Sequence, residues 1–277
     1  PTMAVPHLFI IQLFKCPSDM LTQFRKHWKF LPKAFQVLIA SLFALGLFFR
    51  FAYISDRPYW HDEAHTLLRV SGYTITEVTQ DIFDGRVITR NDVLKYQNIT
   101  PEKSLLNTID SLIREEPHRM PLYYVLTRLW MQVFGNSLAA TRSLSVLISL
   151  FIFPALYWLC LELFQQPLTG WIAIALVSIS PFHVHYAQEI REYGLWAVTL
   201  LLMCSAFLRA IRLNTRPAWM LYTTAIALSL YTFFFSVMIA LGNGFYLIAV
   251  DQSERIRKAI AVLKATLFGG LIFSLWL

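Results

Sequence analysis

Two adjacent carboxylates, Asp62 and Glu63, follow an apolar stretch over residues 34–54 that is long enough to cross a membrane. Ionised groups are costly so close to lipid, and membrane proteins usually keep them there for chemistry or transport. At the mouth of a membrane cleft a carboxylate can act as a general base or orient a hydroxyl acceptor. The alternative is that Asp62 caps a short helix over residues 63–70.

Histidines flank this pair, which raises the question of a metal site. His61 and His65 are four residues apart and share one helix face, as in the zinc-protease motif His-Glu-x-x-His. Here Asp62 takes the place of the glutamate and is one methylene shorter. The motif also lies at the expected start of a helix, whereas the protease motif lies within one. A zinc protease that uses His61 and His65 is therefore a minor alternative.

A second polar segment, over residues 180–193, lies between two apolar stretches. Glu189 and Arg191 are its candidate functional residues, and the alternative is a solvated ion pair at a helix start. For His183 and His185 we expect ordinary positions at the membrane interface.

A third segment, over residues 118–124, begins with His118 and Arg119. The planar donor fork of an arginine suits a phosphate group. Arg119 could equally anchor a helix at lipid headgroups, and the sequence leaves both options open.

The composition sets the class of protein in which these residues act. Hydrophobic residues make up 56% of the chain and charged residues 15%, with a mean hydropathy of +0.51. Because a soluble domain carries about 25% charged residues, we predict an all-α integral membrane protein. The net charge of +7 resides largely in basic clusters beside apolar stretches. Such clusters are typical of topology signals and of anionic lipid contacts, so we expect no nucleic-acid partner.

The apolar stretches predict seven transmembrane helices. They cover residues 34–54, 138–161, 168–184, 193–213, 218–250 and 259–277. As a single helix, the stretch 218–250 would be roughly 50 Å long, so we divide it near residues 231–235. The chain ends within an apolar stretch, and we expect a C-terminal part to be missing.

The basic clusters also predict the topology. Residues 1–33 are expected to be cytoplasmic and residues 34–277 to form the transmembrane module. If residues 121–134 form a helix on the membrane surface, the later basic clusters fall in the cytoplasm, as the positive-inside rule requires. Residues 55–137 then form one large external loop with short helices, and a second external loop carries Glu189 and Arg191. Within the large loop, Pro101 and Glu102 suit a first helical turn.

Three blocks of the sequence resemble the GT-C superfamily of membrane glycosyltransferases. Within it they are similar to the protein-mannosyltransferase-like family, which includes the bacterial lipid A aminoarabinose transferases. The blocks are Trp60-His61-Asp62-Glu63-Ala64, Pro121-Leu122-Tyr123-Tyr124 and Ser180-Pro181-Phe182 followed by Gln188-Glu189-Ile190-Arg191. Their order and spacing agree with the family from residue 34 onward, and Tyr231-Thr232 resembles a Tyr-Thr-His motif. The resemblance implies a GT-C-type bundle of transmembrane helices.

The resemblance also implies an activity. Such enzymes move a sugar from a polyprenyl-phosphate carrier to a protein, lipid or glycan hydroxyl on the non-cytoplasmic face, here expected to be the outer face of a bacterial inner or plasma membrane. The implied catalytic residues are Asp62, Glu63 and Glu189. The implied substrate and phosphate contacts are Arg119, Arg191, Tyr123, Gln188 and His118.

The leaving phosphate needs cationic or metal stabilisation, and a base opposite it would give an inverting displacement. A divalent cation (Mg²⁺, Mn²⁺ or Zn²⁺) remains an option, with Glu189 and His118 as its candidate ligands. The family pattern His-Pro-Pro-Leu-Tyr-Tyr is here Arg119-Met120-Pro121, and Phe233 replaces the histidine after Tyr-Thr.

A transporter or flippase for a lipid-linked sugar is the main rival function. Transporters place polar residues near mid-membrane on broken helices. Here the charged residues Arg50, Arg142 and Glu162 fall near the ends of the predicted spans, which favours an enzyme.

Overall fold

The computed structural model describes residues 28–29, 31–250 and 254–276. Most of the predicted cytoplasmic segment 1–33 lies outside the described residues, as do residues 251–253. The described residues form helices and no strand, and these are, in chain order, α2 (Lys33–Phe51), α3 (His61–Ser71), α4 (Ile75–Ile82), α5 (Arg90–Leu94), the 3₁₀ turn η1 (Lys95–Gln97), α6 (Leu105–Glu115), α7 (Pro121–Phe134), α8 (Leu138–Leu150), α9 (Ile152–Phe164), α10 (Pro167–Ile179), α11 (Pro181–Ala187), α12 (Tyr193–Leu213), α13 (Arg216–Thr232), α14 (Ser236–Val250) and α15 (Arg255–Phe273). This confirms the prediction of an all-α fold.

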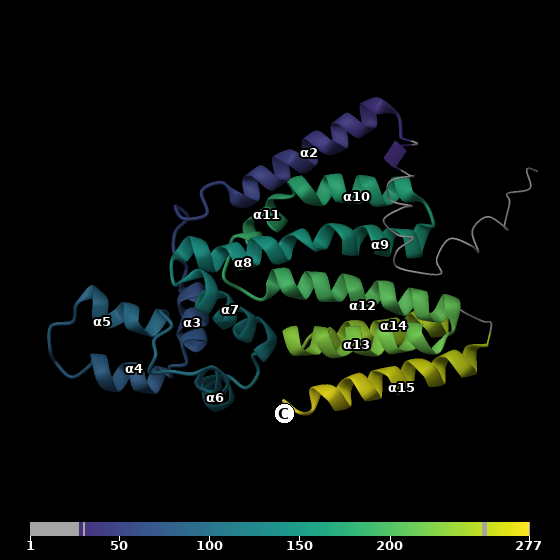
Figure 1. Ribbon diagram of the computed structural model, residues 1–277. Helices are drawn as coiled ribbons and strands as arrows, with labels where there is room; N and C mark the ends of the chain where they lie inside the picture. Colours follow the sequence, from purple (N-terminus) through teal and green to yellow (C-terminus); the bar gives the residue numbers. More distant parts are fainter. Residues whose placement is uncertain (1–27, 30, 251–253, 277) are drawn as a thin grey trace, which may run out of the picture.

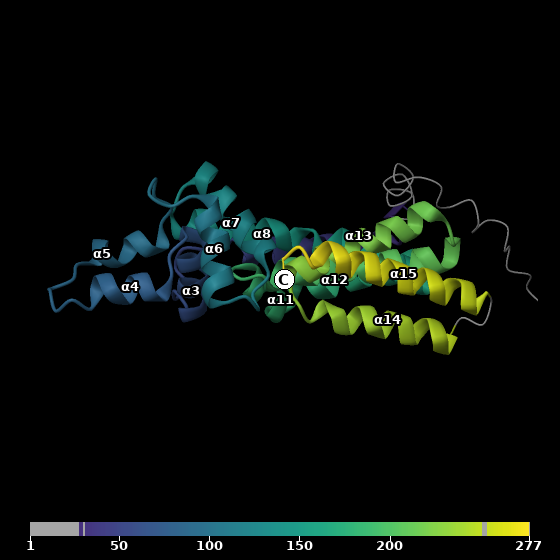
Figure 2. The same cartoon turned by 90° about the horizontal axis from the view of Figure 1, so that it is seen from below.

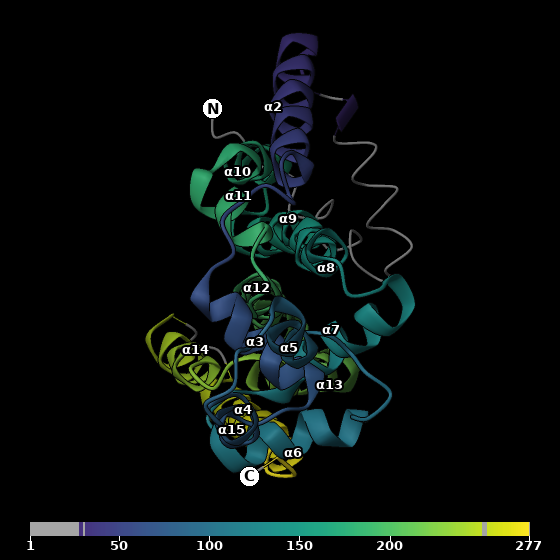
Figure 3. The same ribbon diagram turned by 90° about the vertical axis from the view of Figure 1, so that its left-hand side faces the viewer.

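The long helices form a bundle, and the short helices gather at one end of it. In Figure 1 the helices α2, α8 to α10 and α12 to α15 run side by side, while α3 to α7 lie at the left-hand end. Figure 2 shows α4 and α5 extending beyond that end as an arm. Seen end-on in Figure 3, α2 and α10 lie at one edge of the stack and α15 at the other. The predicted loop over residues 55–137 is therefore a helical cap.

Three apolar cores hold the bundle and the cap together. One joins α2, α9 and α10 through residues such as Ile39, Phe153 and Ile174. A second joins the cap to α8 and the start of α12, and a third joins α12, α13 and α15. Because α12 contributes to the second and third cores, it links the cap to the far side of the bundle.

By length and composition, the described residues contain fewer candidate spans than predicted. Three stretches qualify, namely α2, the continuous 27-residue stretch Leu138–Phe164 and α12, and the bent pair α10–α11 would be a fourth. The helix α13 has 17 residues and α14 has 15, near or below the lower limit of about 17. Four basic residues make α15 too polar for the same test. The prediction of seven spans is thus not confirmed.

Several helix boundaries agree with the sequence prediction, and others do not. The helix predicted over residues 193–213 is α12, the surface helix over residues 121–134 is α7, and the long stretch divides between Thr232 and Ser236. The prediction of one helix over residues 168–184 is wrong in one respect. The structure has two helices there, α10 and α11, which meet at a bend of 64° between Ile179 and Pro181. Proline has no N–H group to continue the hydrogen-bond ladder.

Two predicted helix starts are also wrong. Asp62 is not a cap, because α3 begins at His61 and the side chain of Glu63 accepts the N–H of Trp60 at 3.2 Å. The first turn predicted at Pro101 and Glu102 lies further along the chain, where Ser104 precedes α6.

Close packing of α2 on α10 gives a test of the bundle. A Cβ atom added at Gly46 would lie 2.2 Å from the carbonyl oxygen of Ser178, whereas one at Gly244 in α14 would meet nothing within 4 Å. We expect Gly46→Ala to lower the free energy of unfolding by about 1–3 kcal/mol, as overpacking does. The control Gly244→Ala should be neutral or slightly stabilising. Thermal unfolding in detergent measures both, and equal melting temperatures would contradict this packing.

Candidate active site

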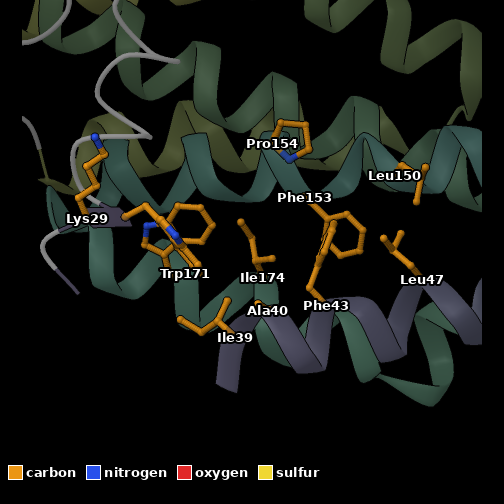
Figure 4. Close-up of a pocket in the computed structure, with 11 residues that line it drawn as sticks. Lys29, Ile39, Ala40, Phe43, Leu47, Leu150, Phe153, Pro154, Trp171 and Ile174 are labelled. Atoms are coloured by element: carbon orange, nitrogen blue, oxygen red, sulfur yellow. The ribbon is translucent and has the colours of Figure 1, made fainter. Parts of the chain in front are cut away.

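The search for a site begins with two cavities of different character. An apolar groove of about 800 Å³ runs between α2, α9 and α10 (Figure 4), and among the described residues that line it Lys29 is the one titratable group. A smaller cavity of about 480 Å³ lies where the bundle meets the cap, and its lining contains several charged groups. The residues around this second cavity are Arg57, Pro58, Trp60, Asp62, Glu63, Arg142, His185, Tyr186, Glu189 and Tyr193. Of these two cavities, the second is the one whose described lining brings together groups that can move a proton.

The frame of this cavity is a buried ion pair between Glu63 and Arg142. Both side chains are 1% exposed, and Oε2 of Glu63 accepts from Nη2 of Arg142 at 2.7 Å while Oε1 accepts from Nε at 2.9 Å. Glu63 also accepts the backbone N–H of Ile190 at 3.1 Å. The remaining donors of Arg142 bind the carbonyls of Ile54, Arg57 and Pro58. Glu63 is therefore fully occupied in positioning other parts of the site.

Asp62 differs from its neighbour in exposure and in partners. Its side chain is 44% exposed, and Oδ2 lies 3.9 Å from Nη2 of Arg191 while Oδ1 lies 3.7 Å from Nδ1 of His61. No hydrogen bond to another described residue occupies the carboxylate. Asp62 thus offers the cavity a carboxylate that can accept a proton.

Glu189 also lines the cavity, in the segment after α11. Its side chain is 15% exposed, and Oε1 lies 2.9 Å from Nε2 of His185. His185 was expected to be an ordinary interface residue, yet it lines the cavity and contacts both Glu189 and Arg57. The only sequence signal for this was its spacing of four residues from Glu189, which suits two side chains on one helical turn.

Gln188, a predicted substrate contact, binds the protein backbone. Its Nε2 donates to the carbonyls of Phe49, Arg50 and Ala52 at 2.8–3.0 Å, and the side chain is buried. It therefore closes the C-terminal end of α2, whose last carbonyls have no helical partner. Its effect on the cavity is to fix where the next residue, Glu189, lies.

Arg119 and Arg191 belong to one cluster beside the cavity, in which Arg191 is buried and the side chain of Arg119 is 21% exposed. Nη1 of Arg119 donates to the hydroxyl of Tyr124 at 3.3 Å, and its Nε pairs with Glu116. Arg191 donates to the hydroxyl of Tyr193 at 3.1 Å. Burial, and after it the carboxylate of Glu192, raises the pKa of Tyr124, so this hydroxyl keeps its proton. Two guanidinium groups in one cluster can stabilise a phosphate.

The sequence did not single out Glu192, which this cluster contains. Its side chain is 6% exposed, and Oε2 lies 3.7 Å from Nε of Arg191. A buried acid beside the two arginines limits the net positive charge there. The sequence shows that Glu192 follows Arg191, but it does not show that Glu192 is buried.

The two other predicted contacts lie elsewhere. The side chain of Tyr123 is 0% exposed and its hydroxyl bonds to Ser145 at 2.7 Å, so it packs α7 against α8 and cannot reach a ligand in this conformation. His118 is exposed and does not line the cavity.

The geometry gives little support for the metal readings. Within residues 28–29, 31–250 and 254–276, no three side chains of His, Cys, Asp or Glu converge. Glu189, one candidate ligand, contacts His185 and not the other candidate, His118. His61 and His65 stack on each other at 4.4 Å between ring centroids, without a third ligand among the described residues.

Comparison with known proteins gives a family match that covers the site residues from Arg119 onward. The family model described as dolichyl-phosphate-mannose-protein mannosyltransferase matches residues 116–277, more than half of the chain. The chain belongs to this family. It is thus a membrane glycosyltransferase of the GT-C type, and the match includes Arg119, Glu189 and Arg191 but not Asp62 or Glu63. Searches of curated proteins and of solved structures gave no match.

The contrast between the two adjacent acids can be tested by stability. Breaking a buried pair leaves an uncompensated charge and costs about 3–5 kcal/mol, so Glu63→Gln should lower the free energy of unfolding by that order. Asp62→Asn, at a half-exposed position, should change it by at most about 0.5 kcal/mol. Thermal or denaturant unfolding of the two purified variants in one detergent measures the difference. Equal losses of stability would show that Glu63 does not frame the site.

Proposed function

We propose that this protein transfers a sugar from a polyprenyl-phosphate carrier to a hydroxyl-bearing acceptor on the non-cytoplasmic face, with inversion. The observation that carries the proposal is the half-exposed Asp62 carboxylate in a charged cavity at the end of the bundle. Family membership supports transfer from a lipid-phosphate sugar, and the cavity supports a place for it.

The reaction is a single displacement at the anomeric carbon. The acceptor oxygen attacks this carbon as Asp62 removes its proton, and the carbon–oxygen bond to the phosphate breaks with its electron pair on the leaving phosphate. A positioned base typically contributes 10²–10⁴-fold to such a step. Arg191, whose Nη2 lies 3.9 Å from Asp62, and Arg119 behind it would supply positive charge to the phosphate from beside the cavity. A single displacement inverts the anomeric carbon, because the acceptor oxygen attacks from the face opposite the leaving phosphate.

The aromatic side chains define the remaining wall of the cavity. Tyr186 and Tyr193 line it and pack edge to face at 5.3 Å between centroids, and Trp60 lies at its rim with its side chain 62% exposed. Flat apolar faces beside carboxylates suit a sugar ring, which has both apolar C–H faces and hydroxyl edges. The acceptor class, whether protein, lipid or glycan, remains open in this proposal.

The first experiment tests Asp62 as the base. Purified Asp62→Asn should lose at least 100-fold in turnover, because an amide cannot take the proton, while it unfolds at the wild-type temperature. The assay measures release of labelled sugar from polyprenyl-phosphate donors in detergent, where a transporter would show nothing. Near wild-type turnover of Asp62→Asn would refute the assignment, and transfer by no donor would favour the transporter.

The second experiment tests the side of the membrane on which the site lies. The loop between α4 and α5 lies at the opposite end of the molecule from the loop between α9 and α10 (Figure 1). The first loop carries Val87, which is 94% exposed, and the second carries the exposed Gln166. In intact cells, a membrane-impermeant maleimide should label Val87→Cys but label Gln166→Cys only after the membrane is opened. Neither position lies in the cavity, so both variants should keep activity. The reverse pattern would place the site on the cytoplasmic side.

A further inference from the structure

His185 stands between two charged side chains at the rim of the cavity. Its Nδ1 lies 2.6 Å from Nη2 of Arg57, and its Nε2 lies 2.9 Å from Oε1 of Glu189. The imidazole is 52% exposed, so it borders the space that a ligand would enter. The mechanism above assigns it no role.

The chemistry of its neighbours fixes the tautomer of this histidine. A guanidinium group has only donors, so the ring nitrogen nearest Arg57 must accept a hydrogen bond. Nδ1 is therefore unprotonated, and the hydrogen of the neutral ring is on Nε2, where it points at Glu189. The neighbour of one ring nitrogen thus decides what the other can do.

Arg57 is itself held in place by the frame of the site. Its Nη1 donates to the carbonyl of His185 at 2.8 Å and lies 3.3 Å from Oε1 of Gln188. Its own carbonyl accepts from Nη1 of Arg142 at 3.2 Å. Arg57 therefore connects the buried Glu63–Arg142 pair to the imidazole.

We propose that His185 is a positioning residue that holds the carboxylate of Glu189 toward the cavity. The donated Nε2–H binds Oε1, and Oε2 has no partner among the described residues, so it remains available to a hydroxyl of the sugar or the acceptor. Arg57 sets the direction of this hydrogen bond, because it donates to Nδ1 and cannot accept a hydrogen bond from it. The inference rests on the proposed function, since it assigns a substrate contact to Glu189.

Two amide substitutions test the two contacts of the imidazole, with Glu189 and with Arg57, independently of each other. In His185→Gln the longer side chain can place its amide N–H where Nε2 stands, and so keep the bond to Glu189. In His185→Asn the shorter side chain reaches only the position of Nδ1, and so keeps only the contact with Arg57. The two variants differ by one methylene, which makes each the control for the other.

Turnover should therefore separate these variants. We expect His185→Gln to stay within about threefold of wild type, and His185→Asn and His185→Ala to fall by about 10-fold to 100-fold, the range for a hydrogen bond to a charged group. Thermal unfolding of each variant checks that the fold is kept. If His185→Asn is as active as His185→Gln, or if His185→Ala is unaffected, the positioning role is overturned.

A spectroscopic measurement tests the inference without any substrate. In ¹⁵N-histidine-labelled protein at pH 8, with the His185 signals assigned by their loss in His185→Gln, Nε2 should show the shift of a protonated nitrogen and Nδ1 that of an unprotonated one. In Arg57→Met the donor to Nδ1 is lost, so the Nδ1 shift should move away from its wild-type value while Nε2, still beside Glu189, stays protonated. A wild-type ring protonated on Nδ1 would overturn the inference. If the expected tautomer is found but no donor lipid supports transfer, the proposed function fails while the directed hydrogen bond stands.

Discussion

The buried ion pair between Glu63 and Arg142 is the interaction on which the rest of the site depends. Removing two charges from water costs several kcal/mol per ion unless hydrogen bonds satisfy the remaining atoms. Here they are satisfied, because Glu63 accepts from Arg142 and from the N–H groups of Trp60 and Ile190, and Arg142 also binds three backbone carbonyls. One carboxylate thereby joins α3, α8 and the segment before α12. Each of these three elements contributes a wall of the cavity.

The same pair explains why two adjacent acids have different roles. Successive residues of an α-helix point about 100° apart, because there are 3.6 residues in each turn. With Glu63 turned inward to Arg142, Asp62 must point away from the buried pair, toward the cavity and Arg191. The pair fixes the rotation of α3, and the rotation exposes the acid that can take part in chemistry. The chemical difference between Asp62 and Glu63 thus arises from the helix and not from the residue types.

The sequence could predict features that depend on local composition. The bounds of α7 and α12 and the break after Thr232 follow from apolar length and spacing. Polar residues beside apolar stretches pointed to Glu189, Arg119 and Arg191 as candidates, and the family resemblance then implied roles for them. It could not predict which polar residues bind one another across the fold. Arg57 and His185 are 128 positions apart in the chain, and Glu63 and Ile190 are 127 apart. Gln188 was predicted to contact a ligand because its actual partners, backbone carbonyls at the end of α2, are distant in the sequence.

The ends of α2 and α10 show how the bundle tolerates an irregular segment beside the site. Backbone groups within lipid must be satisfied by the protein, since water is not there to do so. The carbonyls at the end of α2 accept from Gln188, and those of Val177 and Ser178 at the end of α10 accept from Arg50, which is 0% exposed. Arg50 of α2 thus caps α10, and Gln188, which follows α11, caps α2. These hydrogen bonds satisfy the backbone around the bend near Pro181, so the chain can turn there and bring Glu189 into the lining of the cavity that also contains Asp62. The charge of Arg50 is consequently engaged by the backbone, as expected for an enzyme whose buried charges hold its site in place and not for a carrier whose charges must release a moving ion.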